Sequence, residues 1–232
     1  MKTNSLTGLI DNFLDFFLPR YCLFCNLKLN TIEQYLCNQC TLQLIKCDNN
    51  HSEIKYKQYF ESPNIINELN ALYLFSKETP IQSLIHCLKY QSNYRIGNYL
   101  GKLIASENSD YFRKEIIDFI VPIPLHRVKF TERGYNQSDY IAIGISDLTN
   151  IPIEKNIVKR VKNTESQTRL NHTERKSNVK DAFRFCGKKS LEGKNILLVD
   201  DIITTGSTII ECGRVLKENG AEKIIAFSAA LA

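Results

Sequence analysis

The sequence lacks any apolar run long enough to cross a bilayer, which needs about 20 consecutive apolar residues. Its start, SLTGLIDNFLDFFLP, is apolar, but Asp11 and Asp15 interrupt it and no small-residue cleavage site follows. Apolar residues recur there at three- and four-residue steps, which predicts a short amphipathic helix. We therefore expect a cytoplasmic protein without a membrane span, in which the eight cysteines do not form disulfides.

Two common nucleotide-binding signatures are also missing. The chain contains neither G-x-G-x-x-G nor Gly-Lys-Ser/Thr, which excludes the dinucleotide fingerprint and the P-loop. The 232 residues, 43% hydrophobic and 24% charged, leave room for one α/β domain and a small appendage. The formal net charge of +5 suits a phosphorylated or nucleic-acid partner, although a solvated basic surface is the simpler interpretation.

The chain divides into a cysteine-rich start and a longer region where strand and helix patterns alternate. We assign residues 1–48 to a small N-terminal module, 49–67 to a polar connector, and 68–232 to a parallel sheet with crossover helices. A long polar and basic segment, 162–180, is typical of a functional loop. The predicted strands are Ala71–Phe75, Phe119–Ile123, Ile196–Val199 and Ile224–Ser228, and the predicted helices are Ile81–Tyr90, Tyr94–Ser106, Gln137–Leu148 and Thr208–Asn219.

Four cysteines of the start follow the spacing C-x2-C-x11-C-x2-C: Cys22, Cys25, Cys37 and Cys40. Two such pairs complete a tetrahedral shell of four thiolates, the closed arrangement of structural zinc. Such a site leaves no position for water, so we assign it no catalysis. Two redox dithiols or unrelated buried cysteines are the alternatives, and Cys47 is an alternative ligand.

The strongest motif is ILLVDDIITTGST, residues 196–208. Its apolar run predicts a strand buried on both faces, and Asp200 and Asp201 are expected where that strand ends. Hydroxyls and backbone N–H groups then converge at the start of a helix, where an anion is favoured. The expected phosphate ligands are Thr204, Thr205, Gly206, Ser207 and Thr208. The alternative is a strand–turn–helix whose aspartates only cap.

This segment resembles the motif of type I phosphoribosyltransferases that binds 5-phosphoribosyl pyrophosphate (PRPP). The resemblance implies that Asp200 and Asp201 are catalytic and hold the ribose hydroxyls, and that Thr204–Thr208 holds the 5′-phosphate. It also implies Mg²⁺ bound together with PRPP.

Further segments narrow the resemblance. They are Leu88-Lys89-Tyr90, Val121–His126 with Arg133–Gln137, and a Thr164, Gln167, Arg175, Asn178-Val179, Ala182-Phe183 series. Together with the four cysteines and the phosphate motif, they resemble the ComF family. The resemblance implies a type I phosphoribosyltransferase fold, mostly parallel sheet flanked by helices, with a small zinc-ribbon-like module. It also implies a PRPP-binding protein acting in natural competence and DNA uptake.

Two positions depart from the family's pattern. Tyr135 stands where the family usually has Phe, which keeps the ring. Ser92 stands where Gly often follows the Leu-Lys-Tyr segment. The resemblance implies pyrophosphate roles for Lys89 and Tyr90, and if the loop after them approaches pyrophosphate, a missing Gly alters its backbone conformation.

Phosphoribosyl transfer needs a site that neutralises the leaving pyrophosphate and excludes water from the sugar. Lys89, Arg127 and Arg133 are the cationic candidates, and Arg169, His172 and Arg175 are the candidates on the polar loop. For each, a solvated charge is the competing interpretation.

Three hypotheses follow. The first is a PRPP-dependent transferase whose acceptor the sequence does not identify. The second is a non-catalytic protein that handles single-stranded DNA, although no aromatic and basic platform is obvious in the sequence. The third is a zinc-ribbon adaptor for proteins of the competence machinery.

Overall fold

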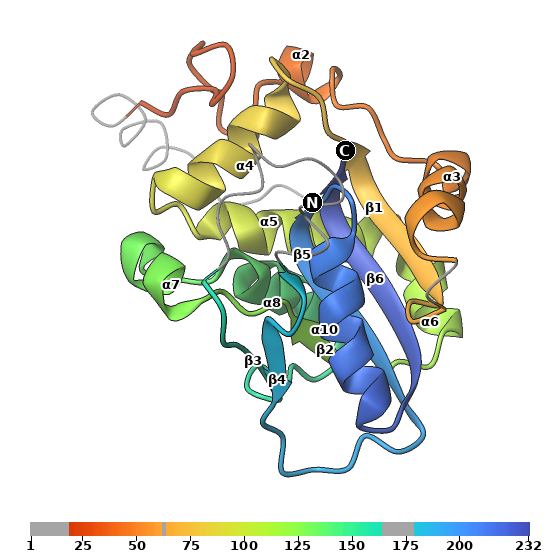
Figure 1. The fold of residues 1–232 in the computed structure, drawn as a ribbon. Helices are drawn as coiled ribbons and strands as arrows, with labels where there is room; N and C mark the ends of the chain where they lie inside the picture. Colours follow the sequence, from red (N-terminus) through yellow and green to blue (C-terminus); the bar gives the residue numbers. More distant parts are fainter. Residues whose placement is uncertain (1–18, 62–63, 164–178) are drawn as a thin grey trace.

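The computed structural model describes residues 19–61, 64–163 and 179–232 (Figure 1). Its centre is a sheet in the order β1-β6-β5-β2, and every neighbouring pair of strands is parallel. The strands are β1 (Glu68–Leu74), β2 (Phe119–Pro122), β5 (Lys194–Ile203) and β6 (Ala221–Leu231). This arrangement confirms the predicted mostly parallel sheet.

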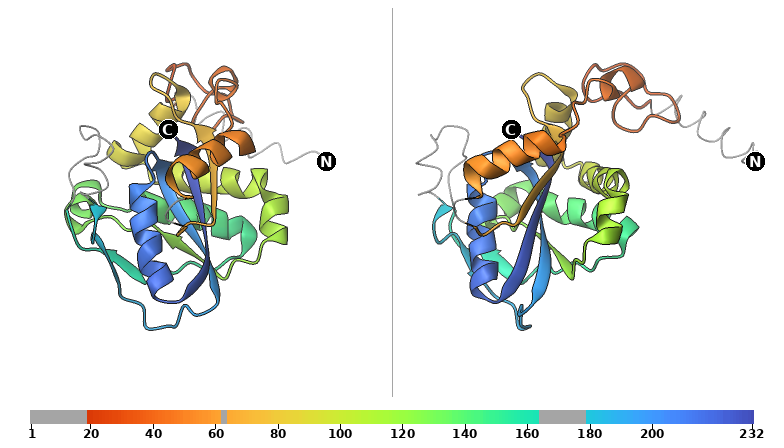
Figure 2. Two further views of the ribbon diagram at one scale, coloured as in Figure 1. Left: turned by 45° about the vertical axis from the view of Figure 1, so that its right-hand side comes forward. Right: turned by 90° about the vertical axis from the view of Figure 1, so that its right-hand side faces the viewer.

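Helices cover both faces of the sheet, as the two views of Figure 2 show. Alternation along β5 explains why both are needed: Leu197 and Val199 belong to one apolar core, and Ile196 and Leu198 to the other. The first core is closed by α4 (Pro80–Tyr90), α5 (Arg95–Glu107) and α8 (Gln137–Thr149), and the second by α10 (Ser207–Glu218) and the end of α3 (Asn49–Tyr59). Two shorter helices, α6 (Ser109–Lys114) and α7 (Arg127–Arg133), precede and follow β2.

Helices α5 and α8 cross at two facing glycines. A Cβ atom on Gly101 would lie 2.1 Å from the carbonyl oxygen of Ile141, and one on Gly144 would lie 2.1 Å from that of Asn98. Only glycine permits this approach of the two backbones. The crossing fixes α8 behind the sheet, with its first turn at the carboxyl ends of β2 and β5.

The predicted strands and helices are confirmed within a few residues at each end, with one difference that matters for the site. Strand β5 continues beyond Val199 to Ile203 because it pairs with β6 as far as Leu231. Asp200 and Asp201 therefore lie within the strand, whereas the sequence placed them after its end.

Six of the described elements had no counterpart in the predictions: four helices, among them α6 and the short α2 (Asn38–Thr41) of the N-terminal module, and two strands. The segment interpreted as a connector contains α3, whose first turn is capped by Asp48, which accepts a hydrogen bond from the His51 N–H group at 2.9 Å. Strands β3 (Val158–Arg160) and β4 (Phe183–Phe185) pair with each other and form a two-stranded antiparallel ribbon. These strands flank the predicted polar loop, most of which lies outside the described residues. Helix α7 was not predicted either.

The N-terminal module lies at one end of the sheet and contains the short helix α2 (Asn38–Thr41). A bridge between Lys46 and Tyr73 joins the chain that leaves it to β1. The predicted amphipathic helix before it falls on residues 1–18, outside the described part of the chain. Among the described residues, no helix has the length and apolar character required to cross a membrane.

Candidate functional site

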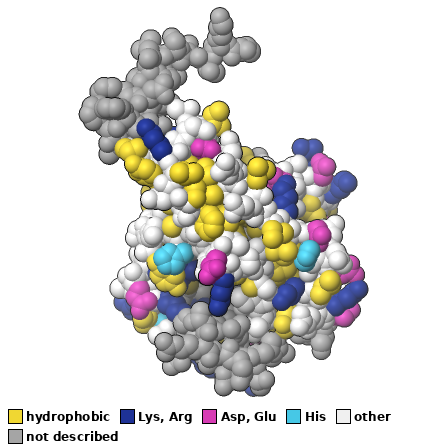
Figure 3. Space-filling view, turned by 90° about the horizontal axis from the view of Figure 1, so that it is seen from above, with side chains coloured by type: hydrophobic (Ala, Val, Ile, Leu, Met, Phe, Trp, Pro, Cys, Tyr) yellow, Lys and Arg dark blue, Asp and Glu magenta, His cyan; other side chains and the backbone are white. Residues whose placement is uncertain are grey.

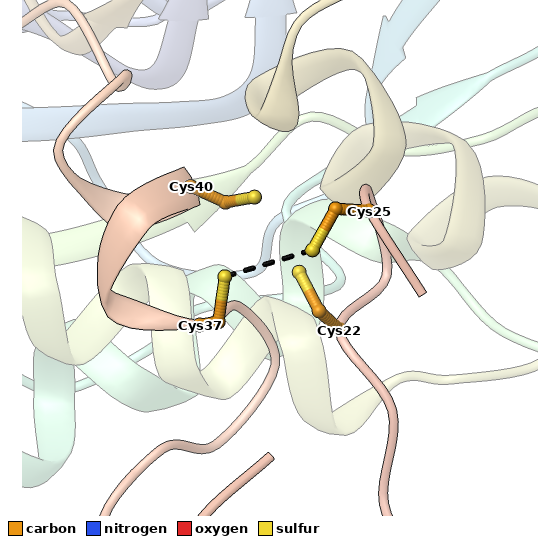
Figure 4. Close-up of side chains that lie close together, drawn as sticks. All are labelled: Cys22, Cys25, Cys37 and Cys40. Carbon is orange, nitrogen blue, oxygen red and sulfur yellow. Dashed lines mark hydrogen bonds between the residues drawn. The ribbon is translucent and has the colours of Figure 1, made fainter. Parts of the chain in front are cut away.

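The four predicted cysteine ligands converge on one point. Cys22 and Cys25 come from a turn, and Cys37 and Cys40 come from the start and body of α2, with all four side chains directed inward (Figure 4). All four sulfur atoms lie within 4.8 Å of one another, and those of Cys25 and Cys37 are 3.6 Å apart. Sulfurs bound to one tetrahedral metal at about 2.3 Å lie about 3.8 Å apart. The cluster can therefore hold a metal ion.

The electrostatics of the cluster fit a cation. Burial raises the pKa of Cys22, but backbone N–H groups of Cys25, Cys37 and Phe24 lower it to about 6. Burial and the neighbouring thiols raise the pKa of Cys40. Thiols this close oppose each other's ionisation, and a bound cation removes that opposition. Cys47, the alternative ligand, lies apart from the cluster and its sulfur is 3.4 Å from the Ser52 hydroxyl.

The acidic pair occupies the carboxyl end of β5. Lys89, from the last turn of α4, places its ammonium nitrogen 2.6 Å from Oδ2 of Asp201. Ser138, in the first turn of α8, donates a hydrogen bond of 3.0 Å to Oδ1 of Asp200. Backbone N–H groups of Asp201 and Ile202 donate to Oδ1 of Asp200 and Oδ1 of Asp201, at 2.9 Å each. Three separate elements thus position the two carboxylates.

The Asp200 carboxyl loses its proton less readily than an ordinary aspartic acid. Burial, and then repulsion by Asp201, raise the pKa of Asp200 to about 7, while the Lys89 charge and the hydrogen bond from Ser138 act in the opposite direction. A group with its pKa near neutrality at the end of a sheet strand is typical of a functional site.

The predicted phosphate loop follows directly. Thr205 and Ser207 are buried and their hydroxyl oxygens are 3.0 Å apart, while Thr204 and Thr208 are half-buried. Gly206 has φ +70°, a left-handed conformation that glycine adopts without strain, and caps the start of α10. The first backbone N–H groups of α10 therefore lie beside these hydroxyls, and this arrangement can bind an anion.

A pocket of about 250 Å³ lies beside the acidic pair. Lys89 connects the two, because it lines the pocket and forms the ion pair with Asp201. The pocket is lined from α4 and the following turn by Lys89, Tyr90 and Ser92, and from α7 by Lys129, Glu132 and Arg133. The guanidinium carbon of Arg133 lies 5.5 Å from the centre of the Tyr90 ring, which is 65% exposed. The structure thus brings Lys89, Tyr90 and Arg133 together.

Two cations of this region were missed from the sequence. Burial, and the charges of Arg160, Arg133 and Lys89, lower the pKa of Lys129. Burial also lowers the pKa of Arg160, and attraction to Asp200 opposes that change. Both belong to elements that were not predicted, α7 and β3. These mutual effects identify a cluster of positive charge around the acidic pair.

Of the remaining basic candidates, the structure describes Arg127 alone. Arg127 is exposed at the start of α7, outside the pocket lining. Arg169, His172 and Arg175 lie outside the described residues.

The segment Arg133–Gln137 connects α7 to α8 and serves the site through its packing. The Nδ2 group of Asn136 donates to the carbonyl of Ile123 at 3.0 Å, and the Tyr135 hydroxyl donates to the carbonyl of Leu88, next to Lys89. Both residues are buried. These bonds fix α4 and α8 to the end of β2.

The backbone conformation at position 92 explains why related proteins often have glycine where this chain has Ser92. It follows the C-cap of α4 with φ +54°, the left-handed conformation that glycine favours at this position. The chain therefore keeps the turn that a glycine would make, with a serine.

A parallel sheet with this acidic pair and anion loop, preceded by a four-cysteine module, defines a phosphoribosyltransferase-fold protein. Residues 135–231 match the family model described as "Phosphoribosyl transferase domain". Competence protein F of Haemophilus influenzae is 31% identical over 213 residues, which cover 88% of this chain and 93% of that protein. The chain belongs to the ComF family.

Two further relatives match over a similar share of this chain. DNA utilization protein YhgH of Escherichia coli is 30% identical over 206 residues, covering 88% of this chain and 86% of that protein. Competence protein ComFC of Bacillus subtilis is 26% identical over 208 residues, covering 87% and 79%. In both comparisons the similarity covers nearly nine tenths of this chain.

Proposed function

We propose that this protein binds PRPP and acts as a phosphoribosyltransferase-like protein of ComF type in the use of incoming DNA during natural competence. The observation that carries the proposal is the acidic pair of β5, set between the hydroxyl-rich start of α10 and a pocket rich in Lys and Arg. The names of the relatives, competence and DNA utilization proteins, support the biological setting. A cytoplasmic location belongs to the same proposal.

Each part of the site has a distinct role in this proposal. Asp200 and Asp201 accept hydrogen bonds from the ribose hydroxyls, and residues 204–208 bind the 5′-phosphate. Lys89, Lys129 and Arg133 neutralise the diphosphate, which leaves when the bond to the ribose C1 atom breaks. A nucleophilic acceptor then forms the new bond to C1. Binding ranks before transfer in this proposal, because the acidic pair and residues 204–208 define what is held.

Metal ions complete the proposal. Four sulfur ligands favour zinc in the N-terminal module, in a structural role. The hard carboxylate oxygens of Asp200 and Asp201 suit Mg²⁺ that arrives with PRPP. That ion would neutralise charge on the leaving diphosphate.

Ligand-dependent stability tests the binding proposal. We expect PRPP with Mg²⁺ to raise the melting temperature more than ribose 5-phosphate or nucleotides do. Asp201→Asn should abolish the shift, whereas Asp110→Asn, the same change on an exposed carboxylate of α6, should keep it. A shift that survives Asp201→Asn would contradict the assigned site. Release of diphosphate with a panel of bases and amines then tests transfer.

A second candidate function is that of a protein-interaction adaptor. Ile32 and Leu42 on the module are 93% and 86% exposed, and Figure 3 shows hydrophobic side chains gathered on this part of the surface. Exposed apolar groups of this kind are typical of protein contacts. Ile32→Ser with Leu42→Ser should abolish capture of a competence-machinery protein while PRPP binding is kept. Unchanged capture would contradict the adaptor role.

A further inference from the structure

Strand β1 forms one edge of the sheet, beside α3 (Figure 1). The chain that leaves the N-terminal module pairs with the second half of this edge. The Leu74 N–H group donates to the carbonyl of Ile45 at 2.8 Å. The Cys47 N–H group donates to the carbonyl of Leu72 at 3.0 Å. This antiparallel ladder stops at Cys47, because Asp48 begins α3 as its N-cap. No described strand pairs with the outer edge of the first half, residues 68–70.

The hydrogen bonds of β1 show which of its backbone groups face outward. The N–H groups of Asn67, just before the strand, and of Phe75, just after it, donate to carbonyls of β6 at 2.8 and 2.7 Å. Alternate residues of a strand direct their N–H and C=O groups to opposite sides. The even-numbered residues of β1 therefore face the outer edge. Glu68 and Asn70 present their backbone groups there, in step with the ladder that already covers the second half.

A pocket of about 300 Å³ lies at these residues, between α3 and β1. Its described lining is Asn49, Ser52, Glu53, Tyr56, Asn67, Glu68, Leu69 and Asn70. The four residues from α3 have the spacing of one helix face. The Tyr56 hydroxyl donates to the carbonyl of Ile66 at 2.9 Å, which ties α3 to the chain entering β1. Helix and strand are thus the two walls of a groove. A helix that only protected the edge would pack against it and leave no such space.

The chemistry of the groove indicates what it can hold. Its described lining contains two carboxylates and no Lys or Arg. Lys223 and Tyr111 already bind the Glu68 carboxylate, at 2.6 Å each. Glu53 pairs with Lys57 on the surface of α3, and both side chains are exposed. An exposed pair of this kind contributes little, so a cation of a ligand can replace Lys57. An amphipathic helix would bring an apolar face and no free backbone groups, whereas an extended basic peptide fits both the edge and the charge.

We propose that this groove binds an extended, basic segment of a partner protein, which adds an antiparallel strand to residues 68–70 and places a Lys or Arg side chain on Glu53. Strand addition takes its affinity from main-chain hydrogen bonds and its specificity from side-chain contacts. The added strand continues the direction of the ladder formed by residues 45–47. The groove shares no lining residue with the phosphoribosyl pocket, and β6 separates β1 from the strand that carries the acidic pair.

A phage-displayed library of random linear peptides, selected on the full chain, supplies the probe. We expect enriched sequences to carry Lys or Arg at alternate positions, and their binding to weaken as salt rises. A synthetic peptide of the most enriched sequence should slow hydrogen exchange at the amides of Glu68 and Asn70. The amides of Asn67 and Phe75, already bonded to β6, are the internal controls and should not change.

Variants test the two parts of the proposal separately. Asn70→Pro removes an outward N–H group at an edge position where proline is tolerated, so the melting temperature should stay near that of the parent. It should weaken peptide binding about 10-fold, because a ladder hydrogen bond is lost. Asn70→Thr keeps the N–H group and should bind like the parent. Glu53→Gln should reduce affinity and salt dependence, whereas Glu61→Gln, on an exposed carboxylate outside the lining, should not.

Three results would each overturn the proposal. They are a selection that enriches no peptide, peptide affinity that Asn70→Pro leaves unchanged, and unchanged exchange at Glu68 and Asn70 with the peptide bound. If Asn70→Pro did not fold, the exchange measurement on the parent protein and the Glu53→Gln comparison would still decide. None of these measurements uses PRPP, so their outcome is independent of the proposed function.

Discussion

The ring of Phe60 occupies the space beside Gly206 where any other residue would place a side chain. A Cβ atom on Gly206 would lie 2.1 Å from Cζ of Phe60, and the Phe60 ring is 1% exposed. Phe60 is the C-cap of α3, the helix that follows the cysteine module. The middle of the phosphate loop is therefore packed against a segment that follows that module.

We expect Gly206→Ala to destabilise the protein by about 1–3 kcal/mol, because the added methyl group overpacks the site and alanine is strained in a left-handed backbone. The same substitution should weaken PRPP binding. In a Phe60→Leu background the added cost should be smaller, because the smaller side chain gives way. Urea unfolding of the four proteins measures the coupling. Strictly additive free energies would show that the ring does not determine the need for glycine at 206.

The difference between Phe60 and Asp201 shows what the sequence could predict. Asp200, Asp201 and the loop at 204–208 are contiguous, so local pattern placed them near the carboxyl end of a buried strand, although that strand extends to Ile203 and includes both aspartates. Phe60 lies in a polar segment without periodicity, and its importance comes from a contact 146 positions away in the chain. Only the tertiary fold creates that contact.

The same reasoning applies to charges and rings. Arg160 belongs to a three-residue strand, too short for a periodic pattern, and reaches the acidic pair only after the chain folds. One groove is lined by four tyrosines from distant parts of the chain, Tyr35, Tyr94, Tyr99 and Tyr140, so the sequence showed no aromatic and basic platform. Long apolar runs such as 196–199 are local signals, and these predicted the sheet.

Stability should depend on pH through Asp200. Its pKa rises from 3.8 to about 7 on folding because of burial and the Asp201 charge. Between these pH values the native protein holds a proton that the unfolded chain has released, so the free energy of unfolding should fall as pH rises from about 4 to about 7. Asp200→Asn should flatten this dependence. Urea titrations at intervals across the range test it, and equal slopes in both proteins would count against the raised pKa.

Ser92 predicts a stabilising substitution. Serine at φ +54° carries backbone strain that glycine avoids. Ser92→Gly should therefore raise the free energy of unfolding by up to about 1 kcal/mol, less the added entropy of the unfolded chain. PRPP affinity should stay within about twofold, because the turn keeps its shape. Ser106→Gly within α5 is the matched control and should destabilise, by about 0.5–1 kcal/mol. Destabilisation by Ser92→Gly would mean that the serine side chain contributes a contact of its own.

Metal removal should affect the module far more than the sheet. The module residues 19–44 have few apolar side chains to bury, so metal binding supplies much of their folding energy. Cys25→Ser removes one of the four clustered sulfurs, whereas Cys186→Ser changes an equally exposed thiol outside the cluster. We expect Cys25→Ser to lose bound zinc, measured by elemental analysis, and to expose the module's amides to hydrogen exchange. Strands β5 and β6 should stay protected, because the apolar core on one of their faces, which includes Ile196, Leu198 and Ile224, contains none of the module residues 19–44. Cys186→Ser should match the parent in both measurements. If a strong chelator left the exchange of residues 19–44 unchanged, the metal would have no structural role there, and the closeness of the four sulfurs would need another explanation.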